Sequence, residues 1–153
     1  MPHLRDRFAA PLLKKMGKLW PVVGLLGPRQ SGKTTLMQNQ LKLKETISFD
    51  DLEAREEASK SPKTFLARLQ SPVVLNEAQK APEIFDAIKL RVDRKRIPGS
   101  YFLTGSSAFS SKLNIRESLT GRIGLVELLP MTLAELNQQT FESREQIIQF
   151  HPK

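Results

Sequence analysis

The sequence predicts a three-layer α/β/α fold, in which a central, mainly parallel sheet of five strands lies between helices. Five short apolar runs punctuate the chain, and segments with helical spacing or composition separate most of them. This alternation is typical of βαβ units, whose parallel strands are buried on both faces. A length of 153 residues is enough for one domain with a substantial core.

The predicted elements follow one another in a simple order. The five strands are the apolar runs at 22–26, 46–49, 73–76, 101–104 and 124–128. The predicted helical segments read KTTLMQNQLKL, LEAREEASK, PKTFLARLQ, PEIFDAIKLRVD, TLAELNQQ and SREQIIQF. Pro82 begins the fourth of these segments, and proline suits a first helical turn because that turn needs no N–H from it.

The chain is expected to have three parts: an N-terminal basic helical segment at 1–20, a core at 21–136 and a C-terminal helical tail at 137–153. The first part lacks the apolar segment and cleavage site of a secretory signal, and it contains no serine. An amphipathic helix is therefore favoured over a transit peptide. Because the tail stops soon after its predicted helices, we expect it to be truncated.

Composition excludes several classes of protein. The chain has no cysteine, which rules out disulfides, thiolate catalysis and cysteine-based zinc sites. Its two histidines, His3 and His151, lie at opposite ends, so a catalytic transition-metal site is not expected. No apolar run approaches the roughly 18 residues of a membrane span. We therefore expect a cytoplasmic protein without a membrane segment.

The net charge of +8 permits binding to nucleic acid or to phosphorylated ligands through nonspecific electrostatics. Part of it comes from RVDRKR at 91–96, for which a solvated helix face is the simpler interpretation. DNA binding is thus permitted by the charge but not indicated by any motif. The basic residues of the N-terminal segment are Arg5, Arg7, Lys14, Lys15 and Lys18.

The strongest motif is GLLGPRQSGKTT, which matches the P-loop pattern G-x-x-x-x-G-K-S/T. It follows an apolar strand and begins a helix, whereas an incidental glycine-rich turn would have no reason to lie there. Loop N–H groups and the helix dipole bind phosphate, Lys33 reaches the β- and γ-phosphates, and the Thr34 hydroxyl binds Mg²⁺. For Arg29, which lies inside the loop, the sequence is equally consistent with a contact to the nucleotide and with a side chain that points to solvent. The predicted residues for ATP and Mg²⁺ are Gly27, Pro28, Arg29, Gln30, Ser31, Gly32, Lys33, Thr34 and Thr35.

A second candidate site element is VVLNE, an apolar strand that ends on Asn76 and Glu77. P-loop enzymes place an acidic residue on the metal side at such a strand end, and a following Glu can activate water. Asn76 then occupies the metal position without a negative charge, and Glu77 occupies the base position. The alternative is that Asn76 caps the following segment. Asp50 and Asp51 end the second predicted strand, and a helix N-cap accounts for Asp51.

Two further polar residues are catalytic candidates. Thr104 ends the fourth strand, where the crevice of a parallel sheet lies, and its hydroxyl can sense the γ-phosphate or the attacking water. Ser106 and Ser107 beyond it are equally well explained as helix caps. Arg122 precedes the last strand and can stabilise phosphate charge in its own chain or in a neighbouring subunit. Pairing with Glu117 on the surface is the alternative.

These motifs together resemble a family of prokaryotic AAA-type ATPases over residues 20–136. The matching segments read GPRQSGKTT, FDDLEAREEA, NEAQKAPEIF, LTGSSAFS and SLTGRIGLVELLPMTLAEL. The resemblance implies a RecA-like core with strand order 5-1-4-3-2, ATP with Mg²⁺, and the usual roles for Lys33, Thr34 and Glu77. It also implies that Gln79 and Arg122 belong to the nucleotide site or its coupling surface.

The chain departs from the family pattern in two ways. The family's Walker B Asp is Asn76 here, so weakened hydrolysis is expected. Family members also usually continue into a C-terminal domain of unknown function. We therefore expect a Mg-ATP-binding ATPase with Glu77 as base, and a non-hydrolysing ATP-dependent binding module as the alternative. A small-molecule kinase is disfavoured because an Asn-Glu pair suits water activation. A homo-oligomer or a protein partner is permitted.

Overall fold

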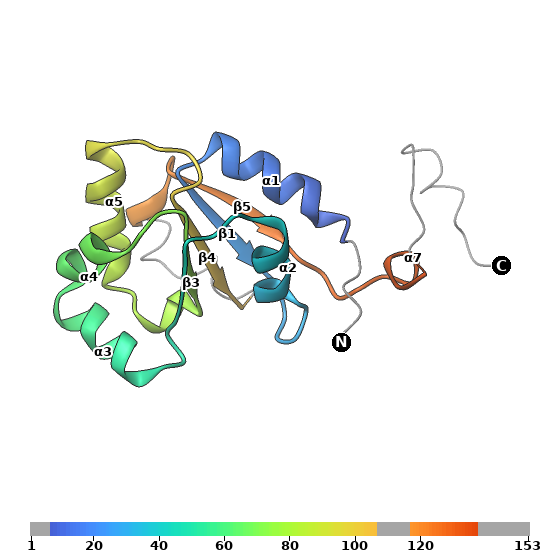
Figure 1. Ribbon diagram of the computed structural model, residues 1–153, viewed down its shortest axis with the longest axis horizontal. Coiled ribbons are helices and arrows are strands. Elements are labelled where there is room, and N and C mark those ends of the chain that lie inside the picture. Colours follow the sequence, from blue (N-terminus) through green and yellow to red (C-terminus); the bar gives the residue numbers. More distant parts are fainter. Residues whose placement is uncertain (1–6, 107–116, 138–153) are drawn as a thin grey trace.

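The computed structural model describes residues 7–106 and 117–137, and it has the predicted three-layer architecture. Five parallel strands form one sheet in the order β2-β3-β4-β1-β5, which confirms both the fold class and the strand order (Figure 1). The strands are β1 (Val22–Leu26), β2 (Glu45–Ser48), β3 (Val73–Asn76), β4 (Tyr101–Gly105) and β5 (Ile123–Glu127).

Helices cover both faces of this sheet. In Figure 1, α1 and α2 lie on one side of the strands, and α3, α4 and α5 lie on the other. The helices are α1 (Ala9–Leu19), α2 (Lys33–Gln40), α3 (Leu52–Lys60), α4 (Pro62–Arg68), α5 (Ile84–Arg94) and the short α7 (Leu133–Leu136), with a 3-10 turn at Ala78–Lys80. Within the described residues, no helix is both long and apolar enough to cross a membrane.

The strands separate two hydrophobic cores because successive side chains of a strand point to opposite faces. Val73 and Leu75 of β3 pack with α3, α4 and α5, whereas Val74 between them packs with α1 and α2. All three side chains are fully buried. A strand buried on both faces must be apolar throughout, which is why each strand could be recognised as a short continuous apolar run.

Most differences from the predicted elements are small. β2 begins at Glu45 and ends before Phe49, whose ring is fully buried and lies 5.9 Å from that of Phe65. Pro82 lies in the turn before α5 rather than in its first turn, and Glu83 is the N-cap. The predicted N-terminal helix corresponds to α1. The predicted helix SREQIIQF and Ser107 lie outside the described residues.

Candidate functional site

A pocket of about 470 Å³ lies at the carboxyl edge of the sheet. The carboxyl ends of parallel strands share one edge, so the loops that follow them converge there. The loop after β1, the N-terminus of α2 and the ends of β2 and β3 all contribute to its wall. The lining residues are Arg29, Gln30, Gly32, Lys33, Thr34, Thr35, Asp50, Asn76 and Glu77.

The loop between β1 and α2 has a backbone path that requires glycine at two positions. A Cβ built on Gly27 would lie 2.2 Å from the carbonyl oxygen of Leu128, so only glycine permits this approach of two backbones. Gly32 has a φ of 89°, in the left-handed region, and Gln30 shares this region at 60°. The loop therefore turns tightly and brings α2 to the pocket with its N-terminal end foremost.

The ammonium of Lys33 lies inside this turn. It donates hydrogen bonds to the carbonyl oxygens of Gly27, at 3.0 Å, and of Pro28, at 2.7 Å, and the residue is only 7% exposed. Burial lowers the pKa of Lys33, and the negative charge of Glu77 opposes that shift. The lysine thus places a partly desolvated cation in the pocket and also holds the loop closed.

Asn76 joins the P-loop to the neighbouring strand β4. Its Oδ1 atom accepts a hydrogen bond from the Thr34 hydroxyl at 3.1 Å and another from the Thr104 hydroxyl. The fully buried Thr104 hydroxyl also accepts from the backbone N–H of Glu77 at 3.2 Å. Asn76 therefore contacts the P-loop threonine rather than capping a helix. Thr104 does not line the pocket but sets the position of Asn76 and Glu77.

Glu77 has an uncommon backbone conformation, with a φ of 53°. A left-handed non-glycine residue carries strain, and such residues concentrate at functional sites. The side chain of Gln79 donates from Nε2 to Oε2 of Glu77 at 2.5 Å, and Glu77 lines the pocket. The backbone turn and this hydrogen bond together hold one carboxylate at the pocket wall, close to the end of β3.

Arg122 is a predicted catalytic residue that the structure places away from this pocket, whereas Thr104, which does not line it either, bonds to Asn76 at its wall. Arg122 directly precedes β5, so it lies at the amino edge of the sheet, the edge opposite to the pocket. Its guanidinium pairs with Asp93 through two contacts of 2.6 and 2.9 Å, instead of with Glu117. The prediction that Arg122 acts in the pocket of its own chain is therefore wrong. A role in a neighbouring subunit stays a prediction.

Two residues, one in the pocket wall and one behind the P-loop, were not assigned a role from the sequence. Asp50 lines the wall and pairs with Lys80, and its place at the end of the second strand was the available signal. Arg7 contacts the P-loop from the N-terminal segment, and nothing in the spacing of the sequence indicated it. Asp51 does act as an N-cap, accepting from the N–H of Glu53 at 3.1 Å.

Charge at the pocket is mixed rather than uniformly acidic, because Arg29 and Lys33 line it together with Asp50 and Glu77. Among the described residues, no group of three or more histidine, cysteine, aspartate or glutamate side chains could hold a metal by itself. A cation at this site would need oxygens from a phosphate ligand in addition to the Thr34 hydroxyl and the Asn76 carbonyl oxygen. That donor set is made of oxygen atoms alone, which suits Mg²⁺.

Known proteins share this sequence pattern and fold. A family model described as an AAA domain matches residues 20–137. Uncharacterized proteins of Mycobacterium bovis and Mycobacterium tuberculosis are each 35% identical to the chain over 135 residues. The match covers 87% of this chain but only 30% of each relative, so the chain spans less than a third of their length.

A solved structure has a similar fold. The Walker-type ATPase of Pyrococcus abyssi is 18% identical, with a TM-score of 0.58, and the match covers 86% of this chain and 55% of that one. At this identity the likeness concerns the fold alone. It agrees with the parallel α/β architecture described above.

Proposed function

The chain belongs to the AAA-domain family of P-loop ATPases, and we propose that it binds ATP with Mg²⁺ in the pocket and hydrolyses ATP with Glu77 as base. One observation carries the proposal: the adjacent residues Lys33 and Thr34 line a single pocket with Asn76 and Glu77. Thr34 and Asn76 are 42 residues apart in the sequence. A cation, a metal-binding hydroxyl and a carboxylate at one edge are what phosphoryl transfer to water requires.

The pocket suits a nucleoside triphosphate with its cation. Its volume falls within the roughly 300–1,000 Å³ of small-molecule sites. The hydroxyl of Ser31 is buried without a hydrogen-bond partner among the described residues, which leaves a polar atom of the P-loop free for a ligand. Loop amides, the N-terminus of α2 and Lys33 all favour an anion. Bound Mg²⁺ would neutralise phosphate charge and polarise the γ-phosphate.

Glu77 is proposed to accept the proton of the attacking water. The water oxygen forms a bond to the γ-phosphorus as the bond to the β,γ-bridging oxygen breaks, and ADP and phosphate are released. Gln79 holds one carboxylate oxygen, at 2.5 Å, and thereby orients the other. Lys33 stabilises the charge that develops on the transferred phosphoryl group.

Asn76 favours a second candidate, a module that binds ATP without turning it over. The amide oxygen keeps the hydrogen bond to Thr34, but the negative charge that would attract the water shell of Mg²⁺ is missing. Loss of such a partner typically costs about 10–100-fold in affinity or activity. Binding through the loop amides and Lys33 survives this loss, whereas hydrolysis depends on the cation.

Calorimetry with ATP and Mg²⁺ and phosphate release, measured on one sample, test both candidates. Binding with turnover supports the ATPase, and binding without turnover supports the module. Asn76→Asp restores the carboxylate, and we expect it to raise turnover by about 10–100-fold. Equal turnover in both proteins would show that the missing charge does not limit the reaction. Absence of binding to ATP and GTP would refute both candidates.

A further inference from the structure

Arg7 connects the P-loop to two other parts of the chain. Its guanidinium donates from Nη1 to the carbonyl oxygen of Ser31 at 2.7 Å and from Nη2 to that of Leu129 at 2.7 Å. The Nε atom donates to Oε1 of Glu135 at 3.1 Å. Only 7% of Arg7 is exposed. A planar guanidinium has a fixed fork of donors, so these three contacts hold its orientation.

The contact with Ser31 determines how the P-loop presents its backbone. In a planar trans peptide, the carbonyl and the following N–H point in opposite directions. The Ser31 carbonyl points to Arg7, so the N–H of Gly32 points away from Arg7. Gly32 lines the pocket, and its left-handed φ of 89° depends on this peptide. Arg7 therefore fixes the orientation of an amide that a bound phosphate would use.

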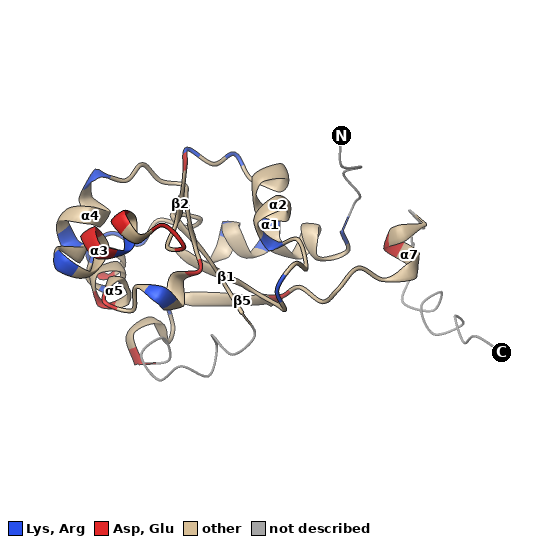
Figure 2. Cartoon of the chain, turned by 90° about the horizontal axis from the view of Figure 1, so that it is seen from below, with Lys and Arg blue, Asp and Glu red and all other residues tan. Residues whose placement is uncertain are grey.

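Glu135 holds Arg7 in place from α7, where it is the acidic residue (red in Figure 2). Its Oε1 atom also accepts from the N–H of Phe8 at 2.8 Å, and its Oε2 atom accepts from the N–H of Thr132 at 2.9 Å. Glu135 is 5% exposed. Because the charges of Arg7 and Glu135 cancel, Arg7 orients the backbone of the P-loop and adds no net positive charge to it.

We propose that Arg7 is a positioning residue for phosphate binding, and that the segment from Leu129 to Glu135 controls nucleotide affinity by orienting it. This inference rests on the proposed nucleotide site but adds a control element outside the pocket. The two residues of the segment that Arg7 contacts, Leu129 and Glu135, lie 122 and 128 residues from it along the chain. The position of the segment therefore depends on the folding of both ends of the described core. Displacement of α7 would release the Ser31 peptide and weaken binding.

The test separates positioning from simple stabilisation. Arg7→Met alone leaves Glu135 buried and unpaired, which destabilises the fold by itself. The double variant Arg7→Met with Glu135→Gln removes both charges and keeps polar atoms at the cap of α7. We expect its melting temperature to recover relative to Arg7→Met, while its affinities for Mg-ATP and ADP, by calorimetry well below melting, stay about tenfold weaker than wild type.

Two further variants complete the design. Arg7→Lys keeps the charge beside Glu135 but lacks the fork, and we expect weakened binding here also. Arg68→Met removes an exposed arginine that pairs with Glu57 far from the pocket, and its affinity should equal that of wild type. Arg68→Met is therefore the control for losing an arginine that does not contact the P-loop.

Each outcome decides the inference. Wild-type affinity in the folded double variant, or in Arg7→Lys, would overturn the positioning role while leaving nucleotide binding intact. Weakened binding in both, with an unchanged Arg68→Met, supports it. A wild-type protein that binds no nucleotide would refute the proposed function and, with it, this inference.

Discussion

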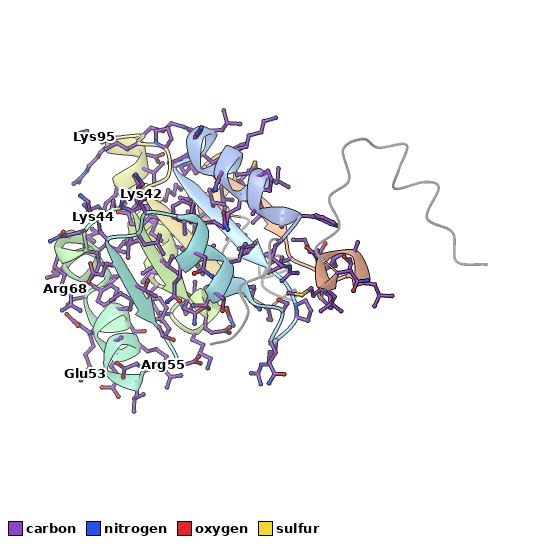
Figure 3. All side chains as sticks on the ribbon, turned by 45° about the vertical axis from the view of Figure 1, so that its right-hand side comes forward. Lys42, Lys44, Glu53, Arg55, Arg68 and Lys95 are labelled. Atoms are coloured by element: carbon purple, nitrogen blue, oxygen red, sulfur yellow. The ribbon has the colours of Figure 1, made fainter. Side chains whose placement is uncertain are left out.

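The two edges of the sheet differ in how they use polar residues. At the carboxyl edge, Thr34, Asn76 and Thr104 are at least partly buried and bond to one another. At the amino edge, charged side chains mostly face solvent, and Lys42, Lys44, Arg68 and Lys95 lie there (Figure 3). Basic residues at helix C-termini complement the helix dipole, and water screens them. The comparison shows that burial and mutual contact, rather than charge density, distinguish the candidate site.

The largest expected effect is the loss of nucleotide affinity on removing Lys33 at the carboxyl edge, and Lys95 at the amino edge provides the matched control. Lys33→Ala should weaken Mg-ATP binding by at least about 100-fold, because in the proposed site the ammonium would face the phosphates, and it also bonds two loop carbonyls. Lys95→Ala, at the amino edge, should leave affinity unchanged in low-salt buffer. Calorimetry on both variants measures this difference. Equal affinities would remove the basis for locating function at the carboxyl edge.

Glycines at the two edges give the next comparison. Gly27→Ala forces the alanine Cβ against the Leu128 carbonyl, so the P-loop must shift, and we expect a loss of about 1–3 kcal/mol in unfolding free energy together with loss of nucleotide binding. Gly121→Ala meets no atom within 4 Å but has a φ of 74°, so backbone strain of about 1–2 kcal/mol is its only cost. Urea unfolding measures both, and nucleotide binding should survive only in Gly121→Ala.

Acidification tests the link between α7 and the P-loop. Burial alone would raise the pKa of Glu135, but hydrogen bonds from Thr132 and Phe8 and the contact with Arg7 outweigh it and lower the pKa below its ordinary 4.5. The unfolded chain therefore binds the proton more readily. This contribution to stability is complete above pH 4.5 and is lost as the pH falls through the folded-state pKa.

A comparison of variants isolates that contribution. Urea midpoints of wild type should fall more steeply below pH 4.5 than those of Glu135→Gln. Glu127→Gln, a change of an exposed glutamate, should keep the wild-type slope. Identical slopes in wild type and Glu135→Gln would show that Glu135 does not titrate differently on folding.

The smallest effect is expected from the pair at the amino edge. Arg122→Ala removes an exposed pair with Asp93, and exposed pairs contribute little. Phosphate release by monomeric protein should therefore equal that of wild type. A loss of turnover seen only at concentrations where the protein self-associates would instead support a role for Arg122 in a neighbouring subunit's site.

Local pattern sufficed to predict the fold, because strands buried on both faces must be short apolar runs. β3 ends at Asn76 as predicted, and the limits of β2, β4 and β5 differ by only a residue at one end or both. The order of strands came from the family resemblance and is confirmed. Helix limits were less certain at Pro82, which lies in a turn before α5, because several starting points for a helix satisfy the same pattern.

The site was predictable where its residues share a loop or end a strand. Parallel strands bring such residues to one edge, which is why Asn76 meets Thr34. Arg122 does not end a strand but precedes one, so its position in the sequence already placed it at the amino edge, opposite to the pocket. Arg7 had no such signal, since a basic residue in an N-terminal segment is ordinarily a solvated one.

The amino-acid sequence alone determined that the chain forms a parallel α/β sheet with a P-loop between its first strand and the next helix. It did so because apolar runs form strands, and glycines with a Gly-Lys-Thr helix start form the P-loop, through interactions between residues that are close in the sequence. Only the tertiary structure decided that Asn76 bonds both Thr34 and Thr104, and that Arg7 bonds both the Ser31 carbonyl and the Glu135 carboxylate. Those contacts depend on packing between distant segments, and no local rule specifies which buried side chains meet.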